Sequence, residues 1–303
     1  MSEIIFHHYW TSPFSEKVRN VFGMKGLAWR SVEQPTILPK PHLIPLTGGY
    51  RKIPVLQIGA DVYCDSQLIL REIERRFPGP KRDANGLSAP LGFWADRAFF
   101  AAGIPLIFSA LGDSVGEDFK KDREALSGAP FDTERMARAV PIMREQFRAH
   151  TGFIEEQLAA NGDFLTGTPS VLDAQAHMNI WFLTSFVPQV AEPLLREFAR
   201  VRAWAARMKA LGYGRPEPMA PEAAIAVAKA ATPETREAAD PNEPNGIAPG
   251  QRVSCVPDDY GKDPVAGVLV ASSAHEIAIR REHPEVGSVV VHFPRAGFWV
   301  APA

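Results

Sequence analysis

The sequence predicts an α/β domain at the N-terminus, then an all-α domain, then a small all-β module. The chain has 303 residues and changes its pattern along its length. Short strand-like runs alternate with helical ones in residues 1–80, helical periodicity dominates residues 88–212, and β-rich runs fill residues 251–303. Residues 213–250 contain seven prolines and are predicted to be a linker around one short helix, Pro221 to Ala231.

The first domain takes its elements from apolar runs and turn residues. Its expected strands are Ile4 to Trp10, Ala28 to Glu33, Ile53 to Ile58 and Ala60 to Cys64. Its expected helices are Ser15 to Gly26 and Ser66 to Phe77. A long connection from Gln34 to Tyr50 divides them. This β-α-β, then β-β-α order predicts a small mixed sheet with helices packed on it.

The second part of the chain has the sequence periodicity of helices, and the last part has that of strands. In the second, Phe93, Trp94, Ala98, Ala101 and Ala102 share one side of a helix, and later helices are expected near Thr133 to Ala160, Val171 to Trp181 and Pro193 to Leu211. In the last, the expected strands are Gln251 to Val256, Val265 to Ala271, Glu276 to Arg281, Ser288 to Phe293 and Phe298 to Val300. A barrel-like or sandwich-like module fits them.

Composition limits the partners. With 33 basic and 35 acidic residues, the chain has no large basic field for nucleic acid or anionic lipid, so a small molecule is the expected ligand. Apolar runs such as Phe99 to Leu111 are too short to cross a membrane, and the N-terminus lacks a leader pattern, so a cytoplasmic location is expected. Cys64 and Cys255 fall in separate predicted domains, which argues against a disulfide framework or a metal site.

A hydroxyl lies at the first strand-to-helix junction, in Ser12-Pro13-Phe14. Pro13 suits the first helical position, so Ser12 is expected to cap the helix. A capping hydroxyl can still donate to a thiolate held at the helix N-terminus. Lowering a thiol pKa from roughly 8.5 to about 6.5 needs about 2.7 kcal/mol. A hydrogen bond to a charged group gives about 1.5 to 3 kcal/mol, so one serine is enough.

Two further motifs allow a structural and a binding function. Pro54 in Lys52-Ile53-Pro54-Val55-Leu56 could simply begin a strand, or it could be cis and turn the Ile53 backbone toward an extended peptide ligand. Asp65 is a good helix N-cap, but Asp65 would also suit an ammonium group and Ser66 a carboxylate. A ligand end with both charges would satisfy both residues.

The order and spacing of these three motifs resemble the glutathione transferase family, most closely its serine-type members with an SPF motif. The resemblance covers about residues 3 to 211 and includes Phe93-Trp94-Ala95-Asp96 and Ser170-Val171-Leu172-Asp173. Ser170 and Asp173 have the spacing of a capping box, which indicates a structural role. The resemblance implies a thioredoxin-like domain followed by a helical domain, a bound glutathione, a homodimer and detoxification chemistry, with no metal.

Roles for the residues follow from the resemblance. Ser12 would donate to the glutathione sulfur, Ile53 before cis Pro54 would pair with the cysteinyl backbone, and Asp65 and Ser66 would hold the γ-glutamyl end. The thiolate would attack an electrophilic carbon or a peroxide.

The motifs do not single out one residue for the glycyl carboxylate or for the electrophile. Lys40 matches the position that reaches the glycyl carboxylate, with Arg51 and Lys52 as alternatives. A hydrophobic electrophile would lie between the domains, against Phe14 and aromatic side chains of the first long helix, such as Trp94, Phe99 and Phe108.

Two alternatives stay open. Tyr9 or Thr11 could replace Ser12 as the thiolate donor, whereas the absence of cysteine at positions 12 and 15 disfavours thiol-disulfide chemistry. The C-terminal module has no counterpart in two-domain transferases. The protein could therefore be a non-catalytic, transferase-like binding or scaffold protein that acts through this module.

Overall fold

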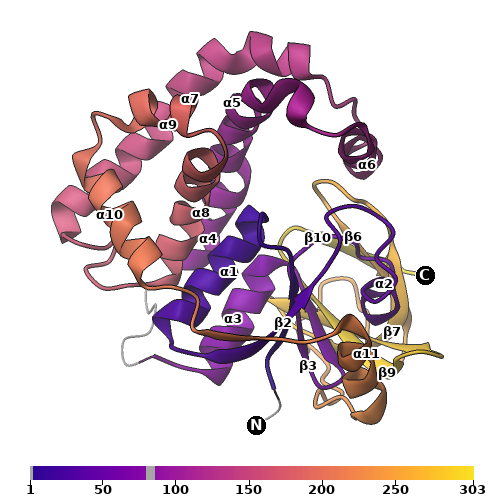
Figure 1. Ribbon diagram of the computed structural model, residues 1–303. Helices are drawn as coiled ribbons and strands as arrows, with labels where there is room; N and C mark the ends of the chain where they lie inside the picture. The colour runs from indigo at the N-terminus through magenta and orange to yellow at the C-terminus, as the bar shows by residue number, and fades with distance from the viewer. Residues whose placement is uncertain (1–2, 80–85) are drawn as a thin grey trace.

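The computed structural model describes residues 3–79 and 86–303 (Figure 1). One ten-stranded sheet runs through the molecule, and a set of helices lies to one side of it, as Figure 1 shows. The strand order is β10-β6-β7-β8-β9-β4-β3-β1-β2-β5. The predicted succession of an α/β part, an all-α part and a β-rich part is confirmed.

The α/β part follows the predicted order closely. Its elements are β1 (Ile5–His8), α1 (Pro13–Met24), β2 (Ala28–Glu33), α2 (Ile44–Thr47), β3 (Val55–Ile58), β4 (Asp61–Cys64) and α3 (Ser66–Arg76). Strand β1 pairs with β2 in parallel and with β3 antiparallel, and β3 pairs with β4 antiparallel. The short helix α2 lies within the predicted long connection from Gln34 to Tyr50.

The alternation of side chains along these strands decides where each helix packs. On β4, Tyr63 joins the apolar cluster that contains α1 and α3, whereas Val62 and Cys64 join the cluster that contains α2. Successive side chains of a strand point to opposite faces, so both faces of this sheet must be covered. Helices α1 and α3 cover one face, and α2 and the later helix α11 (Pro221–Ala230) lie against the other.

The all-α part surrounds one buried helix, α8. Its elements are α4 (Ser88–Phe93), a π-helical segment (Trp94–Phe99), α5 (Phe100–Leu111), a 3₁₀ turn (Gly112–Ser114), α6 (Glu117–Ser127), α7 (Thr133–Asn161), α8 (Val171–Phe186), α9 (Pro188–Leu195) and α10 (Ala199–Ala210). The expected single helix from Pro193 to Leu211 is wrong, because the chain turns between Leu195 and Ala199. The turn lets α9 and α10 each pack on α7 and α8.

The predicted capping box at the start of α8 is confirmed. The Ser170 hydroxyl accepts from the Asp173 backbone N–H, and the Asp173 carboxylate accepts from the Ser170 backbone N–H at 3.0 Å. The same carboxylate accepts from the indole Nε1 of Trp204 at 2.8 Å. The cap therefore ties the central helix to α10.

Replacing Ser170 with alanine should lower the free energy of unfolding by about 0.5 to 2 kcal/mol, because the hydroxyl that satisfies the first turn of α8 is lost. Chemical denaturation measures the change. Ser127→Ala is a suitable control, because the Ser127 hydroxyl lies at an exposed helix end. An equal decrease in the free energy of unfolding in both variants would contradict a stabilising role of the Ser170 cap.

One helical stretch in the described part of the chain, Ser88–Leu111, is long and apolar enough to cross a membrane by length and composition alone. Residues 88–98 extend the apolar run from Phe99 to Leu111 into one continuous helical stretch. A buried helix in the core of a folded protein can have the same length and composition, so one such helix is weak evidence for a membrane span. Its α5 portion packs against α7 and α8.

The C-terminal strands extend the N-terminal sheet. They are β6 (Arg252–Pro257), β7 (Val265–Ser272), β8 (Glu276–His283), β9 (Gly287–Pro294) and β10 (Phe298–Pro302). Strand β9 pairs in parallel with β4, with Asp61 opposite Val290 and Tyr63 opposite His292. The β-rich module was expected as a barrel or sandwich of its own, but its strands continue the first domain's sheet because β9 pairs along β4.

Two further expectations about this region are corrected. The segment expected as a linker holds the predicted helix, α11, but also β5 (Arg215–Pro218), which pairs with β2 as an edge strand. Cys64 and Cys255, expected in separate domains, are both fully buried in one apolar cluster as free thiols. The second correction follows from the shared sheet, which gives the first and last parts of the chain one common core.

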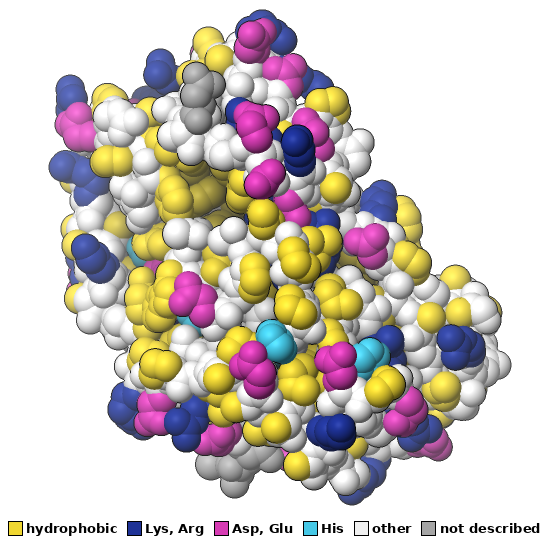
Figure 2. Space-filling model, turned by 45° about the vertical axis from the view of Figure 1, so that its right-hand side comes forward, with side chains coloured by type: hydrophobic (Ala, Val, Ile, Leu, Met, Phe, Trp, Pro, Cys, Tyr) yellow, Lys and Arg dark blue, Asp and Glu magenta, His cyan; other side chains and the backbone are white. Residues whose placement is uncertain are grey.

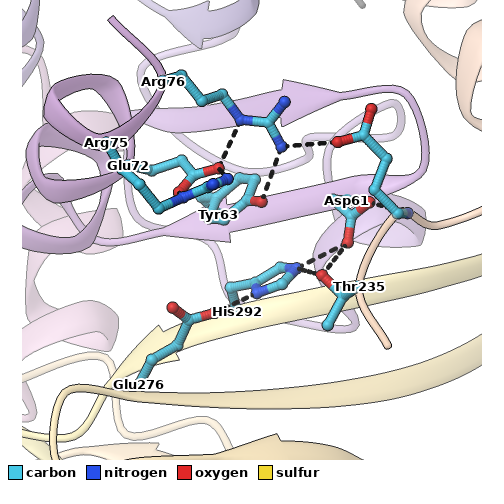
Figure 3. Close-up of polar contacts among 9 residues, drawn as sticks. Asp61, Tyr63, Glu72, Arg75, Arg76, Thr235, Glu276 and His292 are labelled. Atoms are coloured by element: carbon cyan, nitrogen blue, oxygen red, sulfur yellow. Dashed lines mark hydrogen bonds and ion pairs between the residues drawn. The ribbon is translucent and has the colours of Figure 1, made fainter. Parts of the chain in front are cut away.

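A buried imidazole joins the two halves of the sheet (Figure 3). His292 Nδ1 lies 2.5 Å from Glu276 Oε1, and its Nε2 lies 3.0 Å from Asp61 Oδ1. Burial would lower the pKa of His292, but the hydrogen bonds and charges of both carboxylates outweigh burial and raise it. The same contact, with the Thr235 hydroxyl, holds the pKa of Asp61 below its usual value against the effect of burial.

Candidate functional site

Two neighbouring cavities contain the residues that the motifs single out. A wide cavity of about 470 Å³ lies between the α/β part and the helices, and its walls are largely aromatic and aliphatic. Figure 2 shows a hollow with hydrophobic walls on the face turned to the reader. A narrow cavity of about 70 Å³ adjoins it. Phe14, Lys52, Ile53 and Tyr260 line both.

Ser12 caps α1 and also lines the wide cavity. Its Oγ accepts from the Ser15 backbone N–H at 3.1 Å, so the capping role is confirmed. The N-terminal end of a helix favours a negative charge beside it. Tyr9 and Thr11 line the same cavity, so the geometry brings all three candidate donors together, and the choice of Ser12 stays a prediction.

Residues of the other two motifs, Lys52-Ile53-Pro54-Val55-Leu56 and Asp65-Ser66, line the narrow cavity. Ile53, Pro54, Asp65 and Ser66 all line it, although ten residues separate Pro54 from Asp65 in the chain. The Ile53–Pro54 peptide bond is cis, as expected. Antiparallel pairing of β3 with β4 brings the ends of these strands side by side, because Val55 lies opposite Cys64.

Asp65 has a backbone conformation that sequence patterns do not reveal. Its φ of 73° is the one positive value found at a non-glycine residue in the described part of the chain. Its carboxylate accepts from the Gln67 backbone N–H at 2.9 Å and so caps α3. Burial raises the pKa of Asp65, and the charge of Lys52 counteracts this. Unusual backbone conformations of this kind concentrate at ligand sites.

A buried ion pair beside the narrow cavity was missed by the sequence analysis. Lys17 of α1, whose side chain is fully buried, donates to both Asp96 oxygens at 2.7 and 2.8 Å. Gln67 Nε2 donates to the same carboxylate at 2.5 Å. Asp96 belongs to a motif that the resemblance includes, but nothing local to it indicates a partner 79 positions away. The pair links α1, α3 and the helical part at the cavity wall.

The three cations considered for the glycyl carboxylate differ in their partners. Arg51 pairs with Asp122 of α6, and Lys52 Nζ lies 2.8 Å from Asp259 Oδ1. Lys40 donates to the carbonyl of Pro35. Burial, together with the charge of Arg123, lowers the pKa of Lys40 to about 8. A buried ammonium bonded to a neutral carbonyl gains most from a ligand carboxylate, which favours Lys40.

The aromatic walls are only partly as expected. Phe14 and Phe108 line the wide cavity. Phe99 is fully buried in the helical core, so its expected role is wrong. Trp94 instead packs on Phe99 and donates from Nε1 to His150 Nδ1 at 3.1 Å. Both rings contact α7, where Trp94 lies against His150 and Phe99 lies against Phe147 and His150.

The C-terminal module reaches the narrow cavity, which sequence patterns did not indicate. Asp259, Tyr260, Gly297 and Phe298 form part of its wall. The run Asp258-Asp259-Tyr260-Gly261 has the composition of an ordinary turn, and no local feature distinguishes it from one. Within the described ranges, no group of three or more His, Cys, Asp or Glu side chains could hold a metal ion.

Comparisons with known proteins identify relatives of the N-terminal and helical parts of the chain. The family model described as "Glutathione S-transferase, N-terminal domain" matches residues 6–81, and one described as a domain of unknown function matches residues 103–214. Glutathione S-transferase U4 of Arabidopsis thaliana is 31% identical over 67 residues, which are 22% of this chain and 30% of that protein. The chain thus spans only about a third of the length of the first curated relatives that it matches.

Solved structures extend the comparison to the whole chain. A glutathione S-transferase from Rhodospirillum rubrum shares the fold, with a TM-score of 0.51 and 21% identity over 68% of this chain and 87% of that one. A GST-like protein from Pseudomonas syringae is 37% identical, with a TM-score of 0.83, and the match covers 100% of both chains. That match includes the residues of the C-terminal strands as well as those that line the two cavities. The chain therefore belongs to the family of glutathione S-transferase-like proteins.

Proposed function

We propose that the protein is a glutathione transferase that activates the glutathione thiolate for attack on a hydrophobic electrophile. The observation that carries this proposal is the pair of adjoining cavities. Asp65 and Ser66, at the N-terminus of α3, line the narrow cavity. Ser12, at the N-terminus of α1, lines the wide cavity. A zwitterionic ligand end fits the first, and a thiolate fits the second.

Glutathione would extend from one cavity to the other. Its γ-glutamyl ammonium would meet Asp65 and its carboxylate Ser66. Its cysteinyl backbone would pair with Ile53, which lines both cavities. Its glycyl carboxylate would meet the ammonium of Lys40 in the wide cavity. Its sulfur would then lie close to the Ser12 hydroxyl.

The chemistry follows from this placement. The Ser12 hydroxyl and the N-terminus of α1 would stabilise the thiolate, whose sulfur forms a bond with an electrophilic carbon while the leaving group departs with its electron pair. A peroxide is the alternative electrophile. The apolar wall that includes Phe108 and Ile104 would bind the hydrophobic part of the electrophile. We also propose, by analogy with the family, a cytoplasmic homodimer.

The scaffold alternative receives less support. A module that acted only as a binding platform would have no need to reach the proposed glutathione site, yet Asp259 and Tyr260 line the narrow cavity and Tyr260 also lines the wide one. Their position favours a function for the module within the site.

Isothermal titration calorimetry tests the proposal, with millimolar glutathione as the ligand. We expect the wild-type protein to bind, and Asp65→Asn to raise Kd by roughly tenfold or more, because a hydrogen bond to a charged group is worth about 1.5 to 3 kcal/mol. Asparagine retains the capping oxygen and tolerates positive φ, so the variant should fold.

Asp132→Asn is the matched control, since Asp132 caps α7 in the same way and lies outside both cavities. Its Kd should equal that of the wild type. Failure of the wild type to bind millimolar glutathione would contradict the proposed function.

A further inference from the structure

The loop formed by residues 258–261 joins the C-terminal module to the wall between the two cavities. Tyr260 is the one residue of this module that lines both. The other residues shared by both walls are Phe14, Lys52 and Ile53, all from the α/β part. The module thus contributes a side chain at the junction that a bound glutathione would cross.

Contacts to the helical part hold this loop in place. Arg97 Nη2 donates to Asp258 Oδ1 at 2.5 Å, and the Gly261 backbone N–H donates to the Leu126 carbonyl at 2.7 Å. Within the module, the Asp258 N–H donates to the Gly297 carbonyl at 2.9 Å. Gly261 has a φ of 64°, a backbone conformation that favours glycine, and a Cβ there would come within 2.8 Å of the Leu126 side chain. The loop is therefore fixed against α6 and the π-helical segment.

The ring of Tyr260 is held by its neighbours. Lys52 Nζ lies 4.5 Å from the ring centroid and 2.8 Å from Asp259 Oδ1. The same Asp259 oxygen accepts from the Tyr260 backbone N–H at 2.7 Å. A cation above an aromatic face is attracted to it, so the pair of Lys52 and Asp259 orients the ring.

The hydroxyl of Tyr260 is available as a donor. Over residues 3–79 and 86–303, no hydrogen bond to this hydroxyl is present. Burial raises the pKa of Tyr260 well above its ordinary value, and the charge of Asp259 adds to this. The phenol therefore keeps its proton at neutral pH and can donate it to a ligand oxygen.

We propose that Tyr260 is a ligand-binding residue whose hydroxyl donates a hydrogen bond to the carbonyl of the γ-glutamyl–cysteinyl amide of bound glutathione. This inference rests on the proposed function. The γ-glutamyl end belongs with Asp65 and Ser66 in the narrow cavity, and the sulfur belongs with Ser12 in the wide one. The amide that connects them must lie at the junction, where Tyr260 faces the space that Ile53 also lines.

The first test compares glutathione binding by the wild type and by Tyr260→Phe, which removes only the hydroxyl. We expect Kd to rise about two- to tenfold, the effect of one hydrogen bond. Tyr63→Phe is the matched control, because the Tyr63 hydroxyl faces Arg76 and lies outside both cavities. An unchanged Kd in Tyr260→Phe contradicts this proposal alone, whereas no binding by the wild type contradicts the proposed function as well.

A second test locates the contact on the ligand. With γ-glutamylcysteine, which retains the amide but lacks glycine, Tyr260→Phe should raise Kd by the same factor as with glutathione. The pKa of the bound thiol, followed by the ultraviolet absorbance of the thiolate, should not change. Loss of the effect with γ-glutamylcysteine, or a raised thiol pKa, would place the hydroxyl on the glycyl end or on the sulfur and contradict the proposal.

Discussion

Replacing Ser12 with alanine is expected to lower kcat/KM for conjugation of a generic electrophile by roughly 10- to 150-fold. This range corresponds to the loss of about 1.5 to 3 kcal/mol from one hydrogen bond to a charged group. Glutathione should still bind, because Asp65, Ser66 and Ile53 are untouched. The pH dependence of the rate should move to higher pH, because the bound thiol loses the donor that lowers its pKa.

The capping role of Ser12 must be separated from this effect. Its Oγ accepts from the Ser15 backbone N–H, so alanine also removes the cap of α1, which costs about 0.5 to 2 kcal/mol of stability. Glycine at an N-cap costs only a few tenths of a kcal/mol. Ser12→Gly should therefore lose activity like Ser12→Ala while unfolding close to the wild-type transition.

The other donors provide the decisive comparison. Tyr9→Phe and Thr11→Val remove the two alternative hydroxyls of the same cavity wall. Full activity in Ser12→Ala together with inactivity in Tyr9→Phe would show that the donor assignment is wrong.

Removing the imidazole of His292 is expected to destabilise the protein by about 3 to 5 kcal/mol, the usual cost of breaking a buried ion pair. Asp61 is fully buried, so His292→Ala would leave its carboxylate without an opposite charge. His275→Ala is a matched control at an exposed turn of the same module and should change stability by less than about 0.5 kcal/mol. Urea denaturation measures both.

The contact between His292 and Asp61 should make the stability of the protein depend on pH. The pKa of His292 is raised in the folded state, so its stabilising contribution is complete below the unfolded value of about 6.5 and is lost as pH rises through the folded pKa. The pKa of Asp61 is lowered, so its contribution is complete above the unfolded value and is lost as pH falls through the folded pKa. The destabilisation caused by His292→Ala should therefore be larger at pH 6 than at pH 9. A pH-independent difference between variant and wild type would contradict a charged His292.

Several site residues could be predicted because their signals are local. Ser12, Asp65 and Ser170 each cap a helix three or fewer residues away, and proline, hydroxyl and carboxylate patterns mark such positions. The strands of the sheet also follow from short apolar runs. The register of β3 on β4 then brings the KIPVL and Asp65-Ser66 motifs to one cavity, a convergence that the resemblance implied.

The sequence by itself determined the identities and boundaries of most helices and strands, and the motifs that point to a γ-glutamyl thiol ligand. Only the tertiary structure revealed that β9 pairs with β4, that Lys17 meets Asp96 and that Tyr260 reaches the junction of the cavities. Local periodicity shows which face of a segment is buried but carries no information about its partner. His292 and Asp61, 231 positions apart, meet because β9 pairs in parallel with β4, which places them two register positions apart on neighbouring strands and therefore on the same face of the sheet.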